Sequence, residues 1–299
     1  MDVHKARAFL AVADELHFGR AAARLHMTQP PLSRLIRSLE RELGAELFVR
    51  NPRAVELTAV GTALVEPARE LVMQAERIED LVRRVQRGEE GRVRLGFSGS
   101  SVASVVSGLV QKVRSERPLL TLELQGAQLS HRGLERVRAG ELDAIIGRWD
   151  SLPSDVSSLV LAEEGLLVAM PRGHRLAEAE SVAISELADE PWVVLPGSSG
   201  ATLADRLHLL GVRGGFVPRI VETALDSATQ LLLVEAGRGI ALIFSGVRDN
   251  LPTRSVVFRP VTAELGSVQV RLAWRANDAN PLLAAVVDIA QRLAPASQR

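Results

Sequence analysis

The sequence contains no cysteine, which excludes disulfide bonds, thiolate metal sites and cysteine nucleophiles. It also lacks net charge, because Lys+Arg and Asp+Glu are both 36, so the chain as a whole has no basic field that would indicate a nucleic-acid partner. Long apolar runs are missing too. Stretches such as 231–234 and 240–244 are far shorter than the ~20 residues that cross a membrane. Evidence for any nucleic-acid partner must therefore be local, and no membrane partner is expected.

What remains is the composition of an ordinary globular protein. The chain is 46% hydrophobic and 24% charged, and its 299 residues correspond to two or three domains at ~100–200 residues each. Its first residues carry charges at Lys5, Arg7, Asp14 and Glu15, which do not resemble the apolar region of a secretory signal. A cytoplasmic protein is expected, and the absence of cysteine is compatible with that location.

The chain has two parts that differ in sequence pattern. Up to about Gln86 the sequence reads as helix, with one interruption near residues 44–57. From Arg92 onward, short apolar runs alternate with amphipathic helical stretches, which predicts α/β units around a mostly parallel sheet. Strands are predicted at 93–97, 119–124, 144–147, 166–170, 192–195, 219–222, 240–243 and 268–274. Helices are predicted near 101–116, 131–139, 201–210, 226–236 and 281–293.

The N-terminal part predicts three short helices. In the first, helical spacing predicts a buried stripe of Phe9, Leu10, Ala13 and Leu16. The second is expected to begin after Phe18-Gly19, with Arg20 and Arg24 on one outer face. The third is expected to begin at Gln29, because Thr28 is a good N-cap and residues 30–31 are prolines suited to a first turn.

The third helix has an outward face suited to DNA. Its apolar residues at positions 32, 35, 36 and 39 predict the buried side, which leaves outward Gln29, Pro30, Ser33, Arg34, Arg37 and Arg41. Gln and Arg can offer paired donors to base edges, while Ser and further Arg can hold phosphates. Residues 20–53 contain seven Arg and three Glu, so the basic patch missing from the whole chain occurs here.

A wing is predicted after this helix. Gly44 is a plausible helix end, and two short apolar runs, 47–49 and 54–57, flank Asn51-Pro52-Arg53. Such a hairpin would present Arg50 and Arg53 to the DNA backbone. Taken singly, an alanine-rich helix, an exposed arginine or a proline turn is usually only solvated structure.

The order of these residues closely resembles the signature of the LysR family of transcription regulators. The match runs from Phe18 to Glu40, through Leu43-Gly44 and 47–50, to Leu57-Thr58 and Gly61. It departs from the family pattern at Gly19, where a Ser or Thr cap is usual, and at the wing tip, which lacks the usual glycine. The resemblance implies DNA contacts by Arg20, Thr28, Gln29, Pro30, Ser33, Arg34, Arg37, Arg50 and Arg53.

The resemblance also implies a division of the chain. A winged helix-turn-helix, all-α apart from its wing, would occupy residues 1–57, a linker and dimerisation helix 58–87, and an α/β effector-binding domain 88–299. That last domain would have two lobes, like periplasmic solute-binding proteins. Lobe I would comprise residues 92–161 and 268–299, and lobe II residues 162–267.

The linker carries a heptad pattern. Apolar residues recur in steps of four and three, which is typical of paired helices, at Leu64, Ala68, Leu71, Ala75, Ile78, Val82 and Val85. On spacing alone, pairing with a second subunit and packing on the chain's own domain are equally open. The resemblance favours a dimer through this helix and assembly into a tetramer. Pro67 is expected to kink the helix or shift its start.

The effector is expected beyond the carboxyl ends of the strands, against helix N-termini. Hydroxyl-rich loops at 98–101 and 196–202, together with the charge of Arg148, predict an anionic ligand, an organic or aromatic acid. Each residue taken alone is more often an ordinary loop residue. The predicted contacts are Ser98, Ser100, Ser101, Ser130, Arg148, Ser198, Ser199, Thr202 and Thr223.

Enzyme chemistry has no support in the sequence. The Gly-x-Ser-x-Gly pattern of hydrolases is not completed at either candidate loop. Counting from Gly96, its last glycine is replaced by Ser100, and counting from Gly197 it is replaced by Ala201. The six histidines lack metal-ligand spacing, so no catalytic residue, metal or cofactor is predicted. We therefore predict an effector-controlled DNA-binding regulator, with RNA polymerase as a further partner. The alternatives are a solute-binding protein without a transcriptional role and an enzyme with an appended regulatory domain.

Overall fold

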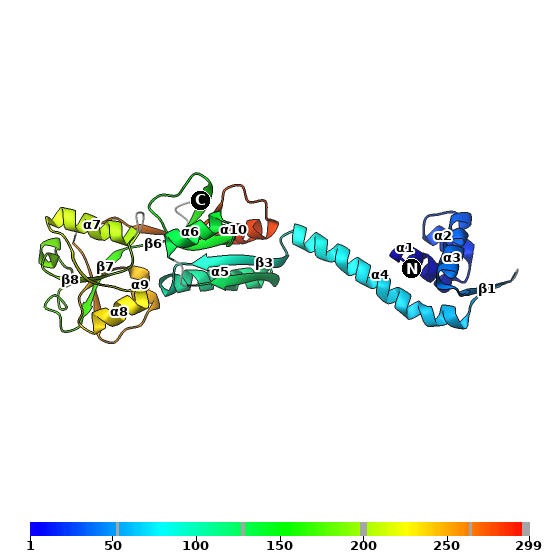
Figure 1. Cartoon of the computed structure of the whole chain (residues 1–299), viewed down its shortest axis with the longest axis horizontal. Helices are drawn as coiled ribbons and strands as arrows, with labels where there is room; N and C mark the ends of the chain where they lie inside the picture. Colours follow the sequence, from blue (N-terminus) through cyan, green and yellow to red (C-terminus); the bar gives the residue numbers. More distant parts are fainter. Residues whose placement is uncertain (52–53, 127–128, 198–201, 263–264, 295–299) are drawn as a thin grey trace. The chain divides into compact units, whose positions relative to one another are not determined.

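The computed structural model describes residues 1–51, 54–126, 129–197, 202–262 and 265–294 (Figure 1). The chain forms two compact units, unit 1 (Met1–Arg84) and unit 2 (Val85–Arg299). Within the described ranges, no helix is long and apolar enough to span a bilayer.

Unit 1 is a helical domain with a β-hairpin. Its elements are α1 (Val3–Glu15), α2 (Phe18–Arg24), α3 (Gln29–Leu43), the antiparallel strands β1 (Phe48–Asn51) and β2 (Ala54–Leu57), and the start of α4 (Ala59–Gln86). The ring of Phe48 ties the hairpin to the helices, with its centroid 5.6 Å from that of Phe9 and 6.0 Å from that of Phe18. Leu32, Ile36 and Leu39 of α3 are fully buried in the same core.

Two predictions for the first helices are wrong. Phe9 is buried as predicted, but Leu16 is 47% exposed, since it is the C-cap of α1 in the left-handed conformation, and Val12 is buried in its place. Helix α2 begins at Phe18, two residues earlier than predicted, because His17 is its N-cap. The backbone N–H groups of Gly19 and Arg20 donate to His17 Nδ1 at 3.0 and 3.2 Å. Gly19 therefore does not replace the cap; it lies inside the first turn.

The apolar residues of α4 are buried in its first half and exposed in its second half. In its first half, Ala68 is fully buried, and Leu64 and Leu71 pack partly buried against the core of unit 1. In its second half, Ile78 is 63% and Val82 49% exposed. The first half of the predicted seam is therefore an intrachain contact, and only the second half is open to a partner. The helix starts before Pro67 and continues through it.

Unit 2 contains a five-stranded sheet in the order β4-β3-β5-β12-β6. Its strands are β3 (Glu90–Phe97), β4 (Leu119–Gln125), β5 (Ala144–Arg148), β6 (Val156–Glu164) and β12 (Val268–Arg275). Helices α5 (Ala103–Glu116) and α10 (Pro281–Leu293) share one core with this sheet, and α6 (Ser130–Arg138) packs in a separate cluster with β5. The short helix η1 (Ser100–Val102) follows β3. We call this part lobe I.

Lobe II is the remainder of unit 2. Strand β7 (Leu166–Pro171) lies between β10 (Ala241–Phe244) and β11 (Val256–Pro260), and β8 (Pro191–Val194) pairs with β9 (Arg219–Thr223). Its helices are η2 (Ile184–Leu187), α7 (Thr202–Gly214), α8 (Ser227–Glu235) and α9 (Ser245–Asn250). The fully buried Trp192 lies in its main core.

The expectation of a mostly parallel sheet holds only in part. β3 is parallel to β4 and β5, and β8 to β9, but β12 runs antiparallel to β5 and β6, and β7 antiparallel to β10 and β11. The difference arises because β6 and β12 carry the chain between the lobes, and β6 and β11 were not predicted. Strand β6 stays paired up to Glu164, opposite Val268, which is three residues beyond the predicted end of lobe I at residue 161.

Candidate DNA-binding surface and ligand pocket

The outward face of α3 carries the predicted polar residues. The buried face is built by Leu32, Ile36 and Leu39, which follow helical spacing. Ser33 is half-buried, and the remaining predicted contacts on this helix and its cap are exposed: Thr28, Gln29, Pro30, Arg34 and Arg37. Thr28 occupies the N-cap position, but no capping bond from its side chain occurs among the described residues.

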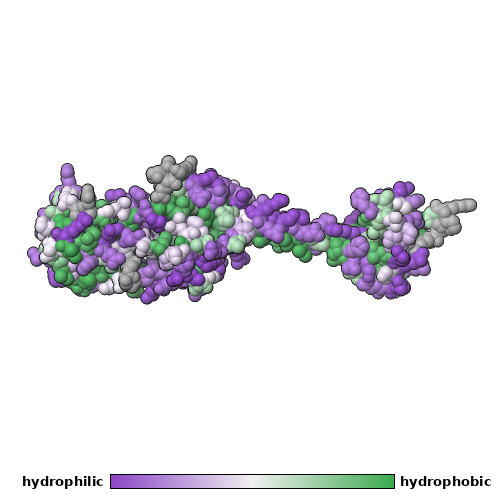
Figure 2. Space-filling view, turned by 90° about the horizontal axis from the view of Figure 1, so that it is seen from above, coloured by the Kyte–Doolittle hydropathy of each residue, from purple (hydrophilic) through white to green (hydrophobic). Residues whose placement is uncertain are grey.

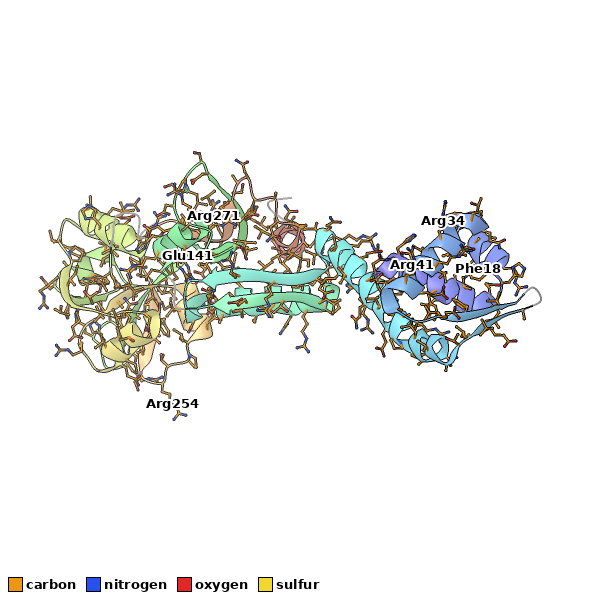
Figure 3. The ribbon with its side chains drawn as sticks, turned by 45° about the vertical axis from the view of Figure 1, so that its right-hand side comes forward. Phe18, Arg34, Arg41, Glu141, Arg254 and Arg271 are labelled. Carbon is orange, nitrogen blue, oxygen red and sulfur yellow. The ribbon has the colours of Figure 1, made fainter. Side chains whose placement is uncertain are left out.

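The arginines of α2 and α3 differ in their partners, and Arg34 and Arg41 of α3 are labelled in Figure 3. Arg20 Nε donates to Glu15 at 3.1 Å and Arg24 Nη1 to Asp14 at 3.1 Å, so both charges are compensated within unit 1. The side chains of Arg34 and Arg37 make no hydrogen bond or ion pair to any described residue. Within the described part of this surface, Arg34 and Arg37 are therefore arginines without a compensating partner, and both lie on α3, the helix whose face was predicted to read bases.

The wing is present as predicted. β1 and β2 pair antiparallel, with Phe48 opposite Leu57 and Asn51 opposite Ala54. Arg53 and the side chain of Arg50 lie outside the described residues. Thr58 fixes the junction with α4, because its hydroxyl donates to Glu46 O at 2.8 Å and accepts from Gly61 N–H at 2.9 Å.

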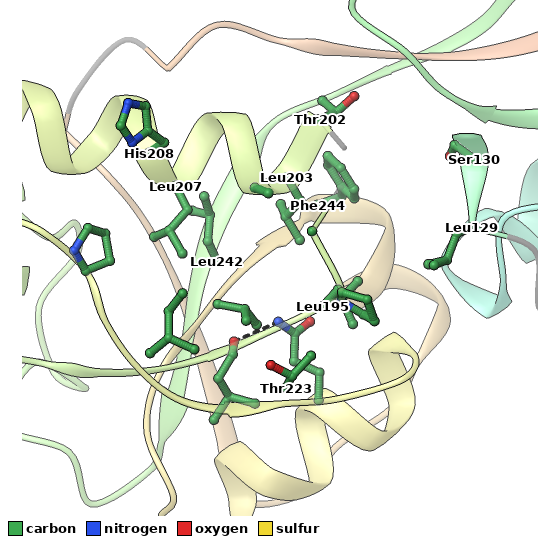
Figure 4. A pocket seen from close by; sticks show the side chains of 18 of the residues that line it. Leu129, Ser130, Leu195, Thr202, Leu203, Leu207, His208, Thr223, Leu242 and Phe244 are labelled. Atoms are coloured by element: carbon green, nitrogen blue, oxygen red, sulfur yellow. Dashed lines mark hydrogen bonds between the residues drawn. The ribbon is translucent and has the colours of Figure 1, made fainter. Parts of the chain in front are cut away.

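Unit 2 contains a cavity of about 450 Å³ between its two lobes (Figure 4). Leu129, Ser130, His131 and Arg148 come from lobe I, and the rest of the lining belongs to lobe II. Most of the lining is apolar, including Val193, Val194, Leu195, Pro196, Leu203, Leu207, Val217, Ile220, Leu242 and Phe244. A largely apolar concave site with a few polar groups is the usual form of a small-molecule pocket.

The predicted effector contacts divide into two groups. Ser130, Arg148, Thr202 and Thr223 line the cavity. The first hydroxyl loop does not: Ser98, Ser100 and Ser101 are absent from the lining. Ser198 and Ser199 of the second loop lie outside the described residues. The sequence reasoning missed Phe244 and Gln230, although a lone glutamine before the apolar run 231–234 is a usable indication of a buried polar contact.

Arg148 already has a carboxylate partner in the chain. Its Nε donates to Glu164 Oε2 at 2.7 Å, and its Nη1 donates to the hydroxyls of Ser101 at 3.1 Å and Ser98 at 3.4 Å. The guanidinium also lies 4.2 Å from the ring centroid of Phe244, and its side chain is only 3% exposed. Ser98 and Ser101 thus accept hydrogen bonds from Arg148, and their contact with a ligand stays a prediction.

Burial acts against both charges of this pair. It raises the pKa of Glu164 and lowers the pKa of Arg148, and the attraction between the two groups opposes both shifts. Around the pair, Ser130 Oγ accepts from the backbone N–H of Arg148 at 3.1 Å, which fixes the start of α6 beside the end of β5.

Two buried polar atoms of the lining residues lack partners. Thr202 is 5% and Gln230 1% exposed, yet Thr202 Oγ1 and Gln230 Oε1 have no hydrogen bond in the part of the chain that the structure describes. Gln230 Nε2 does have one, because it donates to Val193 O at 2.9 Å (Figure 4). Buried polar atoms in native structures usually have partners, so these two are candidates for ligand contacts. No group of three potential metal ligands occurs among the described residues.

Comparison with known proteins gives a consistent result. Residues 3–62 match the family described as bacterial regulatory helix-turn-helix protein, lysR family, and residues 86–295 match the LysR substrate binding domain. The chain is 35% identical over 290 residues to the HTH-type transcriptional regulator ShiR of Corynebacterium glutamicum (strain R), covering 97% of this chain and 98% of that one. It is 37% identical over 262 residues to the HTH-type transcriptional regulator XapR of Escherichia coli (strain K12), covering 87% of each.

A solved structure extends the comparison to DNA. The crystal structure of full-length CbnR complexed with its target DNA has a TM-score of 0.79 and 25% identity, and the match covers 99% of this chain and 100% of that one. The helix-turn-helix match and these regulator relatives leave the solute-binding alternative without support. The chain belongs to the LysR family and is a DNA-binding transcriptional regulator with a substrate-binding domain.

Proposed function

We propose that the exposed face of α3 reads the bases of an operator and that the wing and neighbouring residues hold its phosphates. One observation supports this assignment. The side chains of Arg34 and Arg37 have no partner among the described residues, whereas Arg20 is paired with Glu15. A polyanion would supply the missing partners. Thr28, Gln29, Pro30 and Ser33 share this surface and complete the proposed base-reading set.

An electrophoretic mobility shift with the DNA upstream of the chain's own gene tests this assignment. The double variant Arg34→Ala/Arg37→Ala is expected to lose specific binding, at ~1–3 kcal/mol for each base contact removed. Arg114→Ala is the matched control, because Arg114 is an exposed arginine on α5 of unit 2. Equal binding by the wild type and the double variant would contradict the assignment.

The second half of α4 is proposed as the dimer contact, and a tetramer as the finished assembly. Met73, Ile78, Leu81 and Val82 are all more than 40% exposed, and Figure 2 shows apolar surface along this helix. Ile78 and Val82 are positions of the predicted heptad seam, and Met73 and Leu81 lie beside it, so a second copy of the helix paired along the seam would cover this surface.

The cavity of unit 2 is proposed as the effector site, with Ser130, Thr202, Thr223 and Gln230 as polar contacts. Since the two lobes share the lining, a ligand that binds one arrangement of the lobes better would shift their equilibrium. That shift would reach the operator as a changed footprint, and RNA polymerase would respond to it. The chain works without catalysis in this proposal, in the cytoplasm, where its DNA partner lies.

A further inference from the structure

The cavity has few ionisable groups in its described lining. Arg148 is its only Lys or Arg, no Asp or Glu occurs there, and the other ionisable side chains are those of His131 and His208. The charge of Arg148 is compensated by Glu164, since Nε and Nη2 both lie 2.7 Å from the Glu164 carboxylate. The remaining donors have partners as well: Nη1 donates to two serine hydroxyls, and Nη2 also donates to Ser101 O at 3.5 Å.

The fold holds Glu164 in this position. A Cβ atom at Gly246 would lie 2.2 Å from Glu164 Oε1, so the glycine at the start of α9 leaves the space that the carboxylate occupies. A ligand carboxylate that took Arg148 would displace Glu164, whose side chain is only 10% exposed. A displaced Glu164 would remain largely buried without a partner, which is strongly unfavourable.

The unsatisfied atoms of the lining are neutral. Gln230 Oε1 is a hydrogen-bond acceptor without a partner among the described residues, and Thr202 Oγ1 can either donate or accept. A ligand that matches them needs a hydroxyl or N–H group for Gln230 and needs no charge. Around these atoms the surface is aliphatic or aromatic, including Leu207, Leu242 and Phe244.

We propose that the effector is an uncharged, largely apolar molecule with a hydroxyl or N–H donor, and that Glu164 fills the place a ligand carboxylate would otherwise take. The inference rests on the proposed function of the cavity as the effector site. It replaces the expected organic acid, because the cation on which that expectation depended is paired within the chain.

Calorimetry on the full chain with benzamide and benzoate tests the proposal, because the two probes have similar size and differ in charge. Wild-type protein is expected to bind benzamide ~10-fold or more tightly than benzoate. Glu164→Gln is expected to raise benzoate affinity ~10-fold or more by freeing the guanidinium, since charged hydrogen bonds are the stronger ones. Glu163→Gln is the matched control, because Glu163 is the exposed neighbour on the same strand.

Gln230→Leu provides a second arm that does not alter the ion pair. It is expected to weaken benzamide ~10-fold and to leave benzoate unchanged. If Glu164→Gln fails to fold, the wild-type comparison and this arm decide. Wild type binding benzoate as tightly as benzamide, or Glu164→Gln folding but gaining no benzoate affinity, would overturn the proposal. If benzamide binds but the DNA footprint does not change, the proposed role of the cavity as the effector site is contradicted. The inference that the cavity prefers an uncharged ligand is not affected by that result.

Discussion

The arginines proposed to matter for function have opposite environments in the two units. In unit 1, Arg34 and Arg37 are exposed and lack described partners, and they lie on the helix face that meets DNA in the proposed function. In unit 2, Arg148 is buried and compensated by Glu164, and it lies beside an apolar cavity. Uncompensated charge at an exposed surface suits a polyanion, whereas a compensated charge in a low-dielectric site suits a neutral ligand.

The same contrast occurs within α4 and gives the largest expected effect. Ile78→Glu introduces a charge into the exposed apolar half of the helix, whereas the first half is covered by unit 1. We expect the dimer to dissociate, because ~1.5–3 kcal/mol of apolar burial is lost for each Ile78. Light scattering measures the change, with Glu79→Gln as the control at an exposed charged position. An unchanged oligomer mass would show that this half of the helix is not the contact between subunits.

The next largest effect is expected at the buried ion pair of Arg148 and Glu164. Arg148→Ala leaves Glu164 without its partner and is expected to reduce the free energy of unfolding by ~3–5 kcal/mol. Arg148→Met/Glu164→Met removes both charges and should cost far less. Chemical denaturation of the two variants at pH 7 measures the difference. If Arg148→Ala is as stable as Arg148→Met/Glu164→Met, Glu164 does not carry a buried charge that depends on Arg148.

The exposed arginines should affect DNA binding and leave stability unchanged. Arg37→Ala is expected to weaken operator binding by ~1–3 kcal/mol and binding to scrambled DNA by less, because Arg37 belongs to the proposed base-reading face. Its unfolding free energy should stay within ~0.5 kcal/mol of the wild type. Anisotropy titrations with both DNAs measure the two losses, and an equal loss on both would assign Arg37 to a phosphate instead.

A second carboxylate in unit 2 behaves unlike Glu164. Burial acts to raise the pKa of Asp143, but hydrogen bonds from the side chain and backbone N–H of Arg94 outweigh it and hold that pKa below its usual value. Because the folded-state pKa is the lower one, Asp143 stabilises the fold above about pH 4 and loses this contribution as the pH falls through its folded pKa. The raised pKa of Glu164 has the opposite sign.

Asp143→Asn should therefore cost about 1 kcal/mol at pH 7, since Arg94 is partly exposed and its charge is screened. The difference from the wild type should shrink below about pH 4. Urea titrations at pH 7 and pH 3.5 measure both values. A difference that grows on acidification would contradict the lowered pKa of Asp143.

Much of unit 1 could be predicted from periodicity. The apolar positions of α3 identified Leu32, Ile36 and Leu39, because helical spacing determines which side chains share a buried face. The start of α2 could not be predicted in the same way. His17 caps it through a ring nitrogen, and histidine is not among the residues that usually indicate an N-cap.

The pocket was less predictable, because its decisive contact depends on strand pairing. Glu164 lies on β6, an edge strand whose side chains are mostly half-buried, so its sequence lacks the apolar run that revealed the inner strands. Arg148 could be recognised as a charge at a strand end. Its partner could be recognised only once β12 had brought β5 and β6 into one sheet.

The most direct test of the contrast between compensated and uncompensated arginines is a comparison of Arg20→Ala with Arg34→Ala. Anisotropy titrations with operator and with scrambled DNA measure both variants at one salt concentration. Arg34→Ala is expected to lose ~1–3 kcal/mol of operator affinity and part of the preference for operator over scrambled DNA. Arg20→Ala, which removes a charge already paired with Glu15, is expected to change the free energy of operator binding by less than ~1 kcal/mol. An equal or larger loss in Arg20→Ala, or none in Arg34→Ala, would contradict the assignment of the DNA-reading surface to α3.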